Sequence, residues 1–140
     1  MQNKDEKINK EGDWYLFNAE GKVLGRLSTE ITDCLRGKKD INFAANVILQ
    51  KKVVVINCSK VTVTGRKAEG KKYHSHSGFH GGLKTIDFKT AIAKDARFVI
   101  EHAVKGMLPQ NKLRDKFLGN LYLYNNEVHP HTNAKFVTKK

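Results

Sequence analysis

The chain has 140 residues, enough for one domain with a buried core. Hydrophobic residues make up 39% of it, a share that excludes a compositionally disordered chain. Its 26 lysines and arginines outnumber 14 aspartates and glutamates, and the formal net charge of +12 indicates a polyanionic partner, nucleic acid before an anionic membrane, with an idle basic surface as the remaining interpretation.

A flexible arm, a strand and a helix are expected first. Residues 1–12 are charged and polar and predict an arm without regular structure. The aromatic run over residues 14–17 predicts a strand. Apolar residues then recur at helical spacing over 24–35, and Gly37 is placed to end the helix in the left-handed conformation. A strand followed by a helix is the beginning of an α/β unit.

Two more strands are expected after a basic connection over residues 38–52. Residues 53–56 are β-branched with no polar alternation, which is typical of a strand buried on both faces in the middle of a parallel sheet. Residues 57–59 turn the chain. Residues 61–64 alternate between apolar and polar side chains and predict a half-exposed strand that Gly65 ends.

The second half of the chain is predicted to be mostly helical. Residues 87–94 predict a short helix. Asp95 can cap a second helix, whose continuous apolar face runs from Ala96 to Met107. Pro109 stops this helix because proline cannot continue it.

A third helix and a last strand complete the expected elements. Asn111 can cap a helix that turns Leu113 and Phe117 inward. Residues 121–124 predict the last strand, and residues 125–140 a polar, basic tail. The cations of the third helix are expected to point outward: Lys112, Arg114 and Lys116.

The segment 66–84 has a composition of its own, with five lysines and arginines, three histidines and four glycines. Cationic side chains can neutralise phosphates, and glycines let the backbone approach them closely. Tyr73, Phe79 and the histidines could stack on unpaired bases. The segment predicts an exposed loop or irregular β excursion that contacts RNA; a solvated surface loop is the alternative.

Residues 105–109 join two predicted helices and leave their role open. Met107 and Leu108 could belong to the core, and Gly106 and Pro109 could form a plain turn. A loop held by rigid helices could equally be a binding element. The residues alone give neither interpretation an advantage.

The competing interpretation is a phosphate-binding or metal-assisted enzyme on an α/β fold. Residues 21–26 follow a strand and open a helix, which is a ready anion site, but they match neither the dinucleotide nor the P-loop pattern. Residues 63–67 fail the same test. Nucleophile-elbow and triad patterns are missing, and no paired carboxylates lie in an apolar setting. The motifs therefore predict no catalytic residue.

Histidine pairs raise the question of a metal site. His74 and His76 would share one face of a strand, as would His129 and His131, and such pairs can bind zinc. No cysteine or carboxylate motif completes a set of four ligands, and the nearby lysines oppose metal binding. We therefore expect no metal and no cofactor.

The sequence also bears on location. Cys34 and Cys58 do not form a CxxC pair, and we expect them to be small core residues in a reducing compartment. Residues 1–13 lack the apolar stretch of a signal peptide, and the run 53–56 is far too short to cross a bilayer. The expectation is a soluble, cytoplasmic protein.

Several segments, in order from residue 13 to about residue 131, carry a resemblance to a known family. They are 13–15, 24–29, 53–57, 63–67, 73–78, 81–84, 103–109, 121–124 and 129–131. With them the chain resembles the universal thirteenth protein of the large ribosomal subunit in its bacterial form, and Val-Lys-Gly-Met-Leu-Pro over 104–109 is the most specific match. The chain departs from the family over 47–52, where an acidic Gly-Asp element is usual, and at Arg114, where Gly-Arg is common.

The resemblance implies a fold, a function and partners. The fold would be a three-layer α/β/α arrangement around a short, mainly parallel four-stranded sheet. A single domain would cover residues 13–131, followed by a basic tail over 132–140. The protein would be a structural constituent of the large ribosomal subunit that binds and stabilises 23S-type ribosomal RNA, supports early assembly and lies beside other large-subunit proteins. It would have no catalytic activity, no small-molecule substrate and no membrane partner.

The candidate RNA-binding residues come from the segment 66–84, from the segment 105–109 and from basic or histidine positions in the matching stretches. They are Arg26, Arg36, Lys38, Lys39, Arg66, Lys67, Lys71, Lys72, Tyr73, His74, His76, Ser77, Gly78, His80, Gly81, Gly82, Lys84, Lys105, Gly106, Met107, Pro109, Lys112, Arg114, Lys116, His129 and His131.

Overall fold

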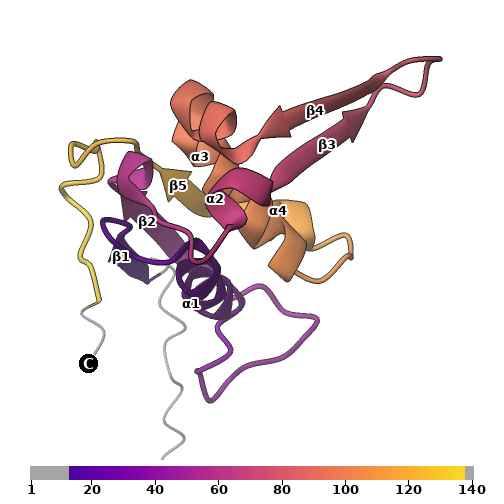
Figure 1. The fold of residues 1–140 in the computed structure, drawn as a ribbon. Helices are drawn as coiled ribbons and strands as arrows, with labels where there is room; N and C mark the ends of the chain where they lie inside the picture. Colours follow the sequence, from indigo (N-terminus) through magenta and orange to yellow (C-terminus); the bar gives the residue numbers. More distant parts are fainter. Residues whose placement is uncertain (1–12, 138–140) are drawn as a thin grey trace, which may run out of the picture.

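The structure is a computed structural model that describes residues 13–137. The arm expected over residues 1–12 and the last part of the expected basic tail, residues 138–140, lie outside the described residues. Figure 1 shows a body built from a small sheet and helices, from which a two-stranded hairpin projects.

A parallel sheet of three strands forms the centre of the body. Its order is β1 (Trp14–Asn18), β2 (Lys52–Ile56) and β5 (Leu121–Leu123), with β2 in the middle. The valines of β2 are fully buried, because neighbouring strands and side chains cover both of their faces. The expectation of a central parallel strand buried on both faces is confirmed, and mixed α/β is the fold class.

The four-stranded sheet implied by the resemblance is wrong for the described residues. Residues 61–64 form only one bridge, between Thr62 and Val23, and not a strand. Their backbone instead bonds to the loop and helix start beside them: Thr62 donates to the Lys22 carbonyl at 3.0 Å and accepts from the Leu24 N–H at 2.8 Å. Apolar and polar residues alternate over residues 61–64 because Val61 points into the core. A second single bridge, between Trp14 and Phe136, lies beyond β1.

Helix α1 (Leu24–Arg36) ends as its sequence predicts. Its buried face carries leucines and an isoleucine at helical spacing. Gly37 follows with φ 67°, in the left-handed region, and the last carbonyls of the helix accept N–H groups from Gly37 and Lys38 at 3.0 Å. The signals for the helix and its stop are both confirmed.

Helix α3 (Phe88–Met107) corresponds to two of the predicted helices. It is bent at Asp95, whose φ of −158° and ψ of 104° are not helical. The Asp95 carboxylate accepts the N–H of Arg97 at 3.0 Å, as a capping residue does for the second half of the helix. Short helices complete the body: η1 (Cys58–Lys60), α2 (Lys67–Gly70) and α4 (Arg114–Gly119).

The main core lies between the helices and one face of the sheet. Val53 and Val55 point into it, together with the buried residues of α1 and α3. Val54 and Ile56 are buried outside this cluster, because alternate residues of a strand face opposite sides. The rings of Trp14 and Tyr122 stack on that second side with their centroids 5.7 Å apart.

Two features of the structure relate to the cytoplasmic location expected from the sequence: the state of the cysteines and the length and polarity of the helices. Cys34 and Cys58 are both free, and Cys58 is fully buried. Burial raises the pKa of the Cys58 thiol to about 11, so this group is a poor nucleophile. Within residues 13–137 no helix is long and apolar enough to cross a membrane.

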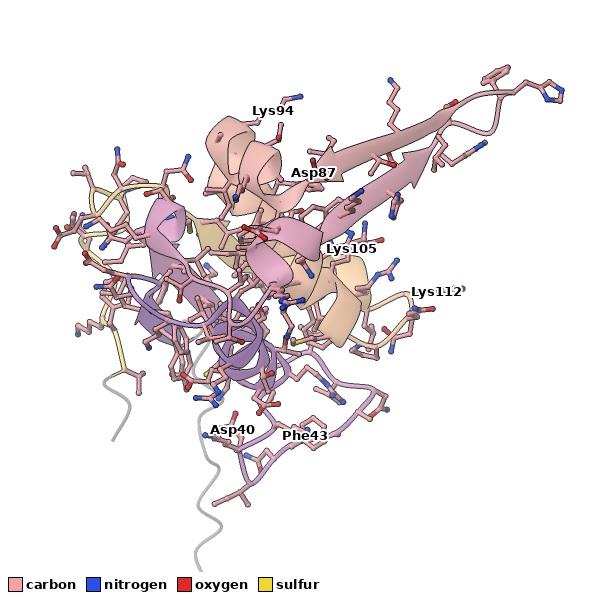
Figure 2. The ribbon with its side chains drawn as sticks, viewed as in Figure 1. Asp40, Phe43, Asp87, Lys94, Lys105 and Lys112 are labelled. Atoms are coloured by element: carbon pink, nitrogen blue, oxygen red, sulfur yellow. The ribbon has the colours of Figure 1, made fainter. Side chains whose placement is uncertain are left out.

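A buried lysine stabilises the connection between α1 and β2. Lys51 is only 7% exposed, and its ammonium pairs with the Asp40 carboxylate and lies 3.2 Å from the Tyr15 hydroxyl. Burial alone would lower the pKa of Lys51, but the hydrogen bonds to Asp40 and Tyr15 outweigh it and raise the pKa. Figure 2 places Asp40 in the loop at the end of α1, where local sequence contains few structural cues.

We expect Asp40→Ala to lower the free energy of unfolding by about 1–3 kcal/mol, since it leaves a buried ammonium without its carboxylate. Asp33→Ala is the matched control, because Asp33 pairs with exposed Lys38 at 3.6 Å, and it should cost less than about 1 kcal/mol. Urea unfolding of both variants measures the difference. An equal loss of unfolding free energy in the two variants would mean that burial of Lys51 does not depend on Asp40.

Candidate nucleic-acid interface

The segment 66–84 forms an arm that projects from the body. After α2, strands β3 (Lys72–His76) and β4 (Leu83–Asp87) pair antiparallel, and Figure 1 shows them extending away from the sheet. The prediction of an irregular β excursion is confirmed in its β character, although the pairing itself is regular. Nearly all of its side chains are exposed.

The tip of the arm depends on glycine. Gly78 and Gly81 have φ of 86° and 69°, values that residues with a side chain rarely adopt. Gly82 donates its N–H to the Phe79 carbonyl at 3.0 Å, and a Cβ on Gly82 would collide with Ser77. Phe79 is 79% exposed at this tip. The glycines thus hold a tight turn that presents an aromatic ring to solvent.

Cross-strand register places the polar side chains on defined faces of the arm. His74 lies opposite Thr85, and its Nδ1 is 2.9 Å from the Thr85 hydroxyl. His76 shares that face, as expected from strand periodicity, whereas Lys84 pairs with Ser75 on the other face. The arm therefore carries cationic or polar side chains on both of its faces.

Tyr73 does not fit its predicted role in base stacking. Its ring is only 7% exposed and meets the rings of Phe98 and His102 edge-on, at centroid distances of 5.6 and 5.1 Å. The Lys71 ammonium lies 5.4 Å from the ring centroid, and burial raises the pKa of the Tyr73 hydroxyl. Tyr73 anchors the arm to α3. Its local sequence is polar, so only the tertiary structure shows this burial.

Basic residues gather where the arm joins the body. A hollow of about 400 Å³ there is lined by Arg66, Lys67, Gly70 and Lys71. None of these cations forms an ion pair within residues 13–137, nor do Lys72 and Lys84 farther along the arm. Lysines elsewhere, such as Lys51 and Lys60, do pair with carboxylates. The arm thus offers unneutralised positive charge.

The C-terminal end of α3 forms an exposed elbow. Met107 is 42% exposed and its sulfur lies 3.6 Å from the Thr29 hydroxyl of α1, so its predicted burial is wrong. Val104 and Leu108 beside it are buried, so only one side of this last turn is exposed. A Cβ added at Gly106 would meet no atom within 4 Å. Lys105 is exposed too, and Arg26 lies exposed on α1.

The segment after the elbow is less helical than predicted. Asn111 accepts the N–H of Leu113 at 3.1 Å, but α4 begins only at Arg114. Lys112 and Lys116 are exposed as expected, and Figure 2 labels Lys112 in this loop and Lys105 near the end of α3. Arg114 is half-buried, and its Nε has no hydrogen-bond partner within residues 13–137, so it does not point freely outward.

His129 and His131 belong to an aromatic cluster on the second side of the sheet. The Nε2 of His131 lies 2.9 Å from the Tyr124 hydroxyl, and its ring packs against Trp14 and Tyr122 at 5.0 and 4.6 Å. Both histidines are half-buried. No group of three metal-ligating side chains exists within residues 13–137. These histidines have a packing role that sequence spacing did not indicate.

Arg36, Lys38 and Lys39 form a separate group at the end of α1. The Arg36 guanidinium lies 5.7 Å from the centroid of the Phe43 ring, and Lys38 pairs with Asp33. In Figure 1 this end of α1 and its loop lie at the bottom, well away from the projecting arm. The structure therefore does not gather all the predicted residues into one patch.

Phe98 and His102 were missed as candidates. They lie one helical turn apart on α3 and both are exposed, beside Tyr73 at the base of the arm. The sequence contains a signal for this pair in its four-residue spacing, since residues four apart on a helix share a face. An exposed phenylalanine beside a histidine offers a surface on which a base can stack.

Comparison with known proteins matches most of the chain to one family. The sequence pattern of the family described as ribosomal protein L13 matches residues 12–130. The chain is 50% identical over 120 residues to the large ribosomal subunit protein uL13 of Azotobacter vinelandii, across 86% of this chain and 84% of that protein. It is 50% identical over 119 residues to the protein of that name from Idiomarina loihiensis, across 85% and 84% of the two chains.

The buried Tyr73 ring yields a stability prediction. We expect Tyr73→Ala to lower the free energy of unfolding by about 3–5 kcal/mol, because it empties the contact between the arm and α3. Tyr73→Phe should change it by less than about 1 kcal/mol, since the hydroxyl has no hydrogen-bond partner within residues 13–137. Thermal unfolding of both variants tests this, and equal losses would show that the hydroxyl, and not the ring, holds the arm.

Proposed function

Because the chain belongs to the ribosomal protein L13 family, we propose that its projecting arm and its elbow bind and stabilise 23S-type ribosomal RNA. The protein is a structural constituent of the large ribosomal subunit and not an enzyme. Family membership thereby overturns the alternative of a phosphate-binding or metal-assisted enzyme. The contacts within the subunit are the part that we propose.

The unpaired cations of the arm carry this proposal. Arg66, Lys67, Lys72 and Lys84 are exposed and lack an ion pair within residues 13–137. Like charges held together by a fold repel one another unless a polyanion neutralises them. Ribosomal RNA supplies phosphates that these cations can neutralise, and each contact releases counterions. His74, His76, Ser77, His80 and the glycines of the tip would then lie against the RNA as well.

The elbow supports a second contact. Lys105, Lys112 and Lys116 are exposed and unpaired within residues 13–137, while Gly106 leaves open space for a close neighbour. Phosphate contacts of this kind position a protein on RNA without reading its sequence. Arg26 lies on the adjoining face of α1, where Thr29 meets Met107, and we include it, Pro109 and Arg114 in this contact.

The remaining candidates receive different roles. Arg36, Lys38 and Lys39 would form a smaller, separate contact at the end of α1. Tyr73, His129 and His131 would act through packing, because their rings contact other side chains of the protein. We treat residues 13–131 as the domain that presents the interface, and we extend the proposal to early subunit assembly and to neighbouring large-subunit proteins as partners.

Removing the arm's exposed charges tests the main contact. The variant Arg66→Ala, Lys67→Ala, Lys72→Ala and Lys84→Ala should retain its thermal midpoint, because these side chains are exposed. Lys71 stays in place since it lies over the Tyr73 ring. The dependence of ribosomal RNA affinity on salt should become shallower, by about 0.7–0.9 in log–log slope for each phosphate that the variant no longer neutralises.

The control removes four exposed lysines that lie outside the proposed interface: Lys22, Lys60, Lys94 and Lys135. Because Lys60 pairs with Glu20, the thermal midpoint of the control is measured as well. The control changes the net charge by the same amount, so a general charge effect would weaken RNA binding equally in both variants. Filter binding over a range of salt concentrations compares them. Equal slopes in the arm variant and the control would reject the arm as the interface.

Gly106→Gln tests the elbow. The new side chain enters open space, so it should cost less than about 1 kcal/mol of stability. It should reduce incorporation into large subunits, since RNA or a neighbouring protein would occupy that space. Gly119→Gln is the control, because a Cβ there also meets no atom within 4 Å. Normal incorporation of a folded Gly106→Gln protein would make the elbow a simple turn.

A further inference from the structure

One edge of the central sheet is open. Strand β5 bonds to β2 on its inner side: Val53 donates its N–H to the Asn120 carbonyl and Tyr124 donates to the Val55 carbonyl, both at 2.9 Å. Alternate residues of a parallel strand bond to the same neighbour, so Leu121 and Leu123 direct their N–H and C=O groups away from β2. No strand within residues 13–137 pairs with them.

The opposite edge of the sheet is partly closed. There Val137 donates its N–H to the Trp14 carbonyl at 2.8 Å, and Phe136 bridges to the same residue. Proteins usually cover or charge an unpaired strand edge, because it is a template for another chain. The outer edge of β5 pairs with no strand within residues 13–137, although its residues are half-buried beside α4.

A hollow of about 340 Å³ lies beside the open edge. Its apolar lining comes from Leu118 of α4 and from both leucines of β5. Its charged lining comes from α3, as Asp95, Arg97 and Glu101. The hollow could receive apolar side chains from a strand that paired with β5, since alternate side chains of that strand would point to this face.

The charge of this hollow differs from that of the rest of the protein. Asp95 and Arg97 neutralise each other through two contacts of 3.0 Å, and the guanidinium lowers the pKa of the Asp95 carboxyl. Glu101 is exposed and forms no ion pair within residues 13–137. The hollow is thus net negative in a chain of charge +12. Its unpaired Glu101 can meet a lysine or an arginine, which favours a polypeptide partner over RNA.

We propose that the outer edge of β5 binds an extended, basic segment of a neighbouring protein, which pairs with Leu121 and Leu123 as a fourth strand. Backbone hydrogen bonds would hold it, its apolar side chains would lie on the leucines of the hollow, and a lysine or arginine would meet Glu101. Strand pairing at β5 does not depend on the RNA interface, although Glu101 lies one helical turn from Lys105 of the elbow.

The test uses the full chain, labelled with ¹⁵N, and a blocked extended peptide as the probe. The peptide has threonine at alternate positions and valines and one lysine at the positions between them, so that the valines and the lysine face the hollow. Peptide binding should shift the amide signals of Leu121 and Leu123 and slow their hydrogen exchange by about tenfold or more at saturation. The same peptide with glutamate in place of lysine, and a short single-stranded RNA, serve as the other probes. Both should leave the β5 signals unchanged.

Charge reversal supplies the matched variants. Glu101→Lys should weaken binding of the lysine peptide by about fivefold. Glu127→Lys changes the net charge equally at another exposed glutamate and should leave binding unchanged. Equal binding of the lysine and glutamate peptides, or RNA-induced shifts at β5, would overturn the proposal. So would slow exchange at both leucines before peptide is added, because another segment or a second copy would then cover the edge.

Discussion

Burial of β2 on both faces is the constraint on which the rest of the structure depends. A short parallel strand of valines between two neighbours exposes apolar side chains above and below unless both sides are covered. Helices α1 and α3 cover one side and complete the main core. The rings of Trp14, Tyr122 and His131 lie on the other. The helices thereby fix the base of the arm, through Tyr73, and the elbow at the end of α3.

The distribution of charge follows from this arrangement. Carboxylates pair with cations within the body, as in Lys51 with Asp40 and Lys60 with Glu20, where they tie connections to the sheet. The exposed cations of the arm form no ion pair within residues 13–137, although Glu69 lies in α2 and Asp87 lies opposite Lys72, so their positive charge is left for a partner. The hollow beside β5 has the opposite sign. The described residues therefore present chemically distinct surfaces: a cationic arm, which we propose for RNA, and a hollow at β5, which we propose for a basic polypeptide.

The features that were predicted correctly depend on residues that are neighbours in the sequence. The β-branched run predicted β2, Gly37 predicted the end of α1, and Asp95 predicted the cap at the start of the second half of α3, because each depends on residues close in the chain. The burial of Tyr73 depends on Phe98 and His102 from another element, and the segment around Tyr73 is polar. Residues 61–64 have the alternation of a strand, but the backbone of the loop before α1 takes their hydrogen bonds. The open edge of β5 depends on strand order, which no local pattern contains.

The central proposal places the arm and the elbow against RNA and leaves Lys22 and Lys94 outside every proposed contact. Acetylation rates of individual lysines, measured by mass spectrometry in the free protein and in large subunits, test it most directly. We expect strong protection of Lys72, Lys84, Lys105 and Lys112 in the subunit, because phosphates would cover them, whereas Lys22 and Lys94 should stay reactive. Lysines of the arm that react as fast in the subunit as in the free protein would contradict the claim.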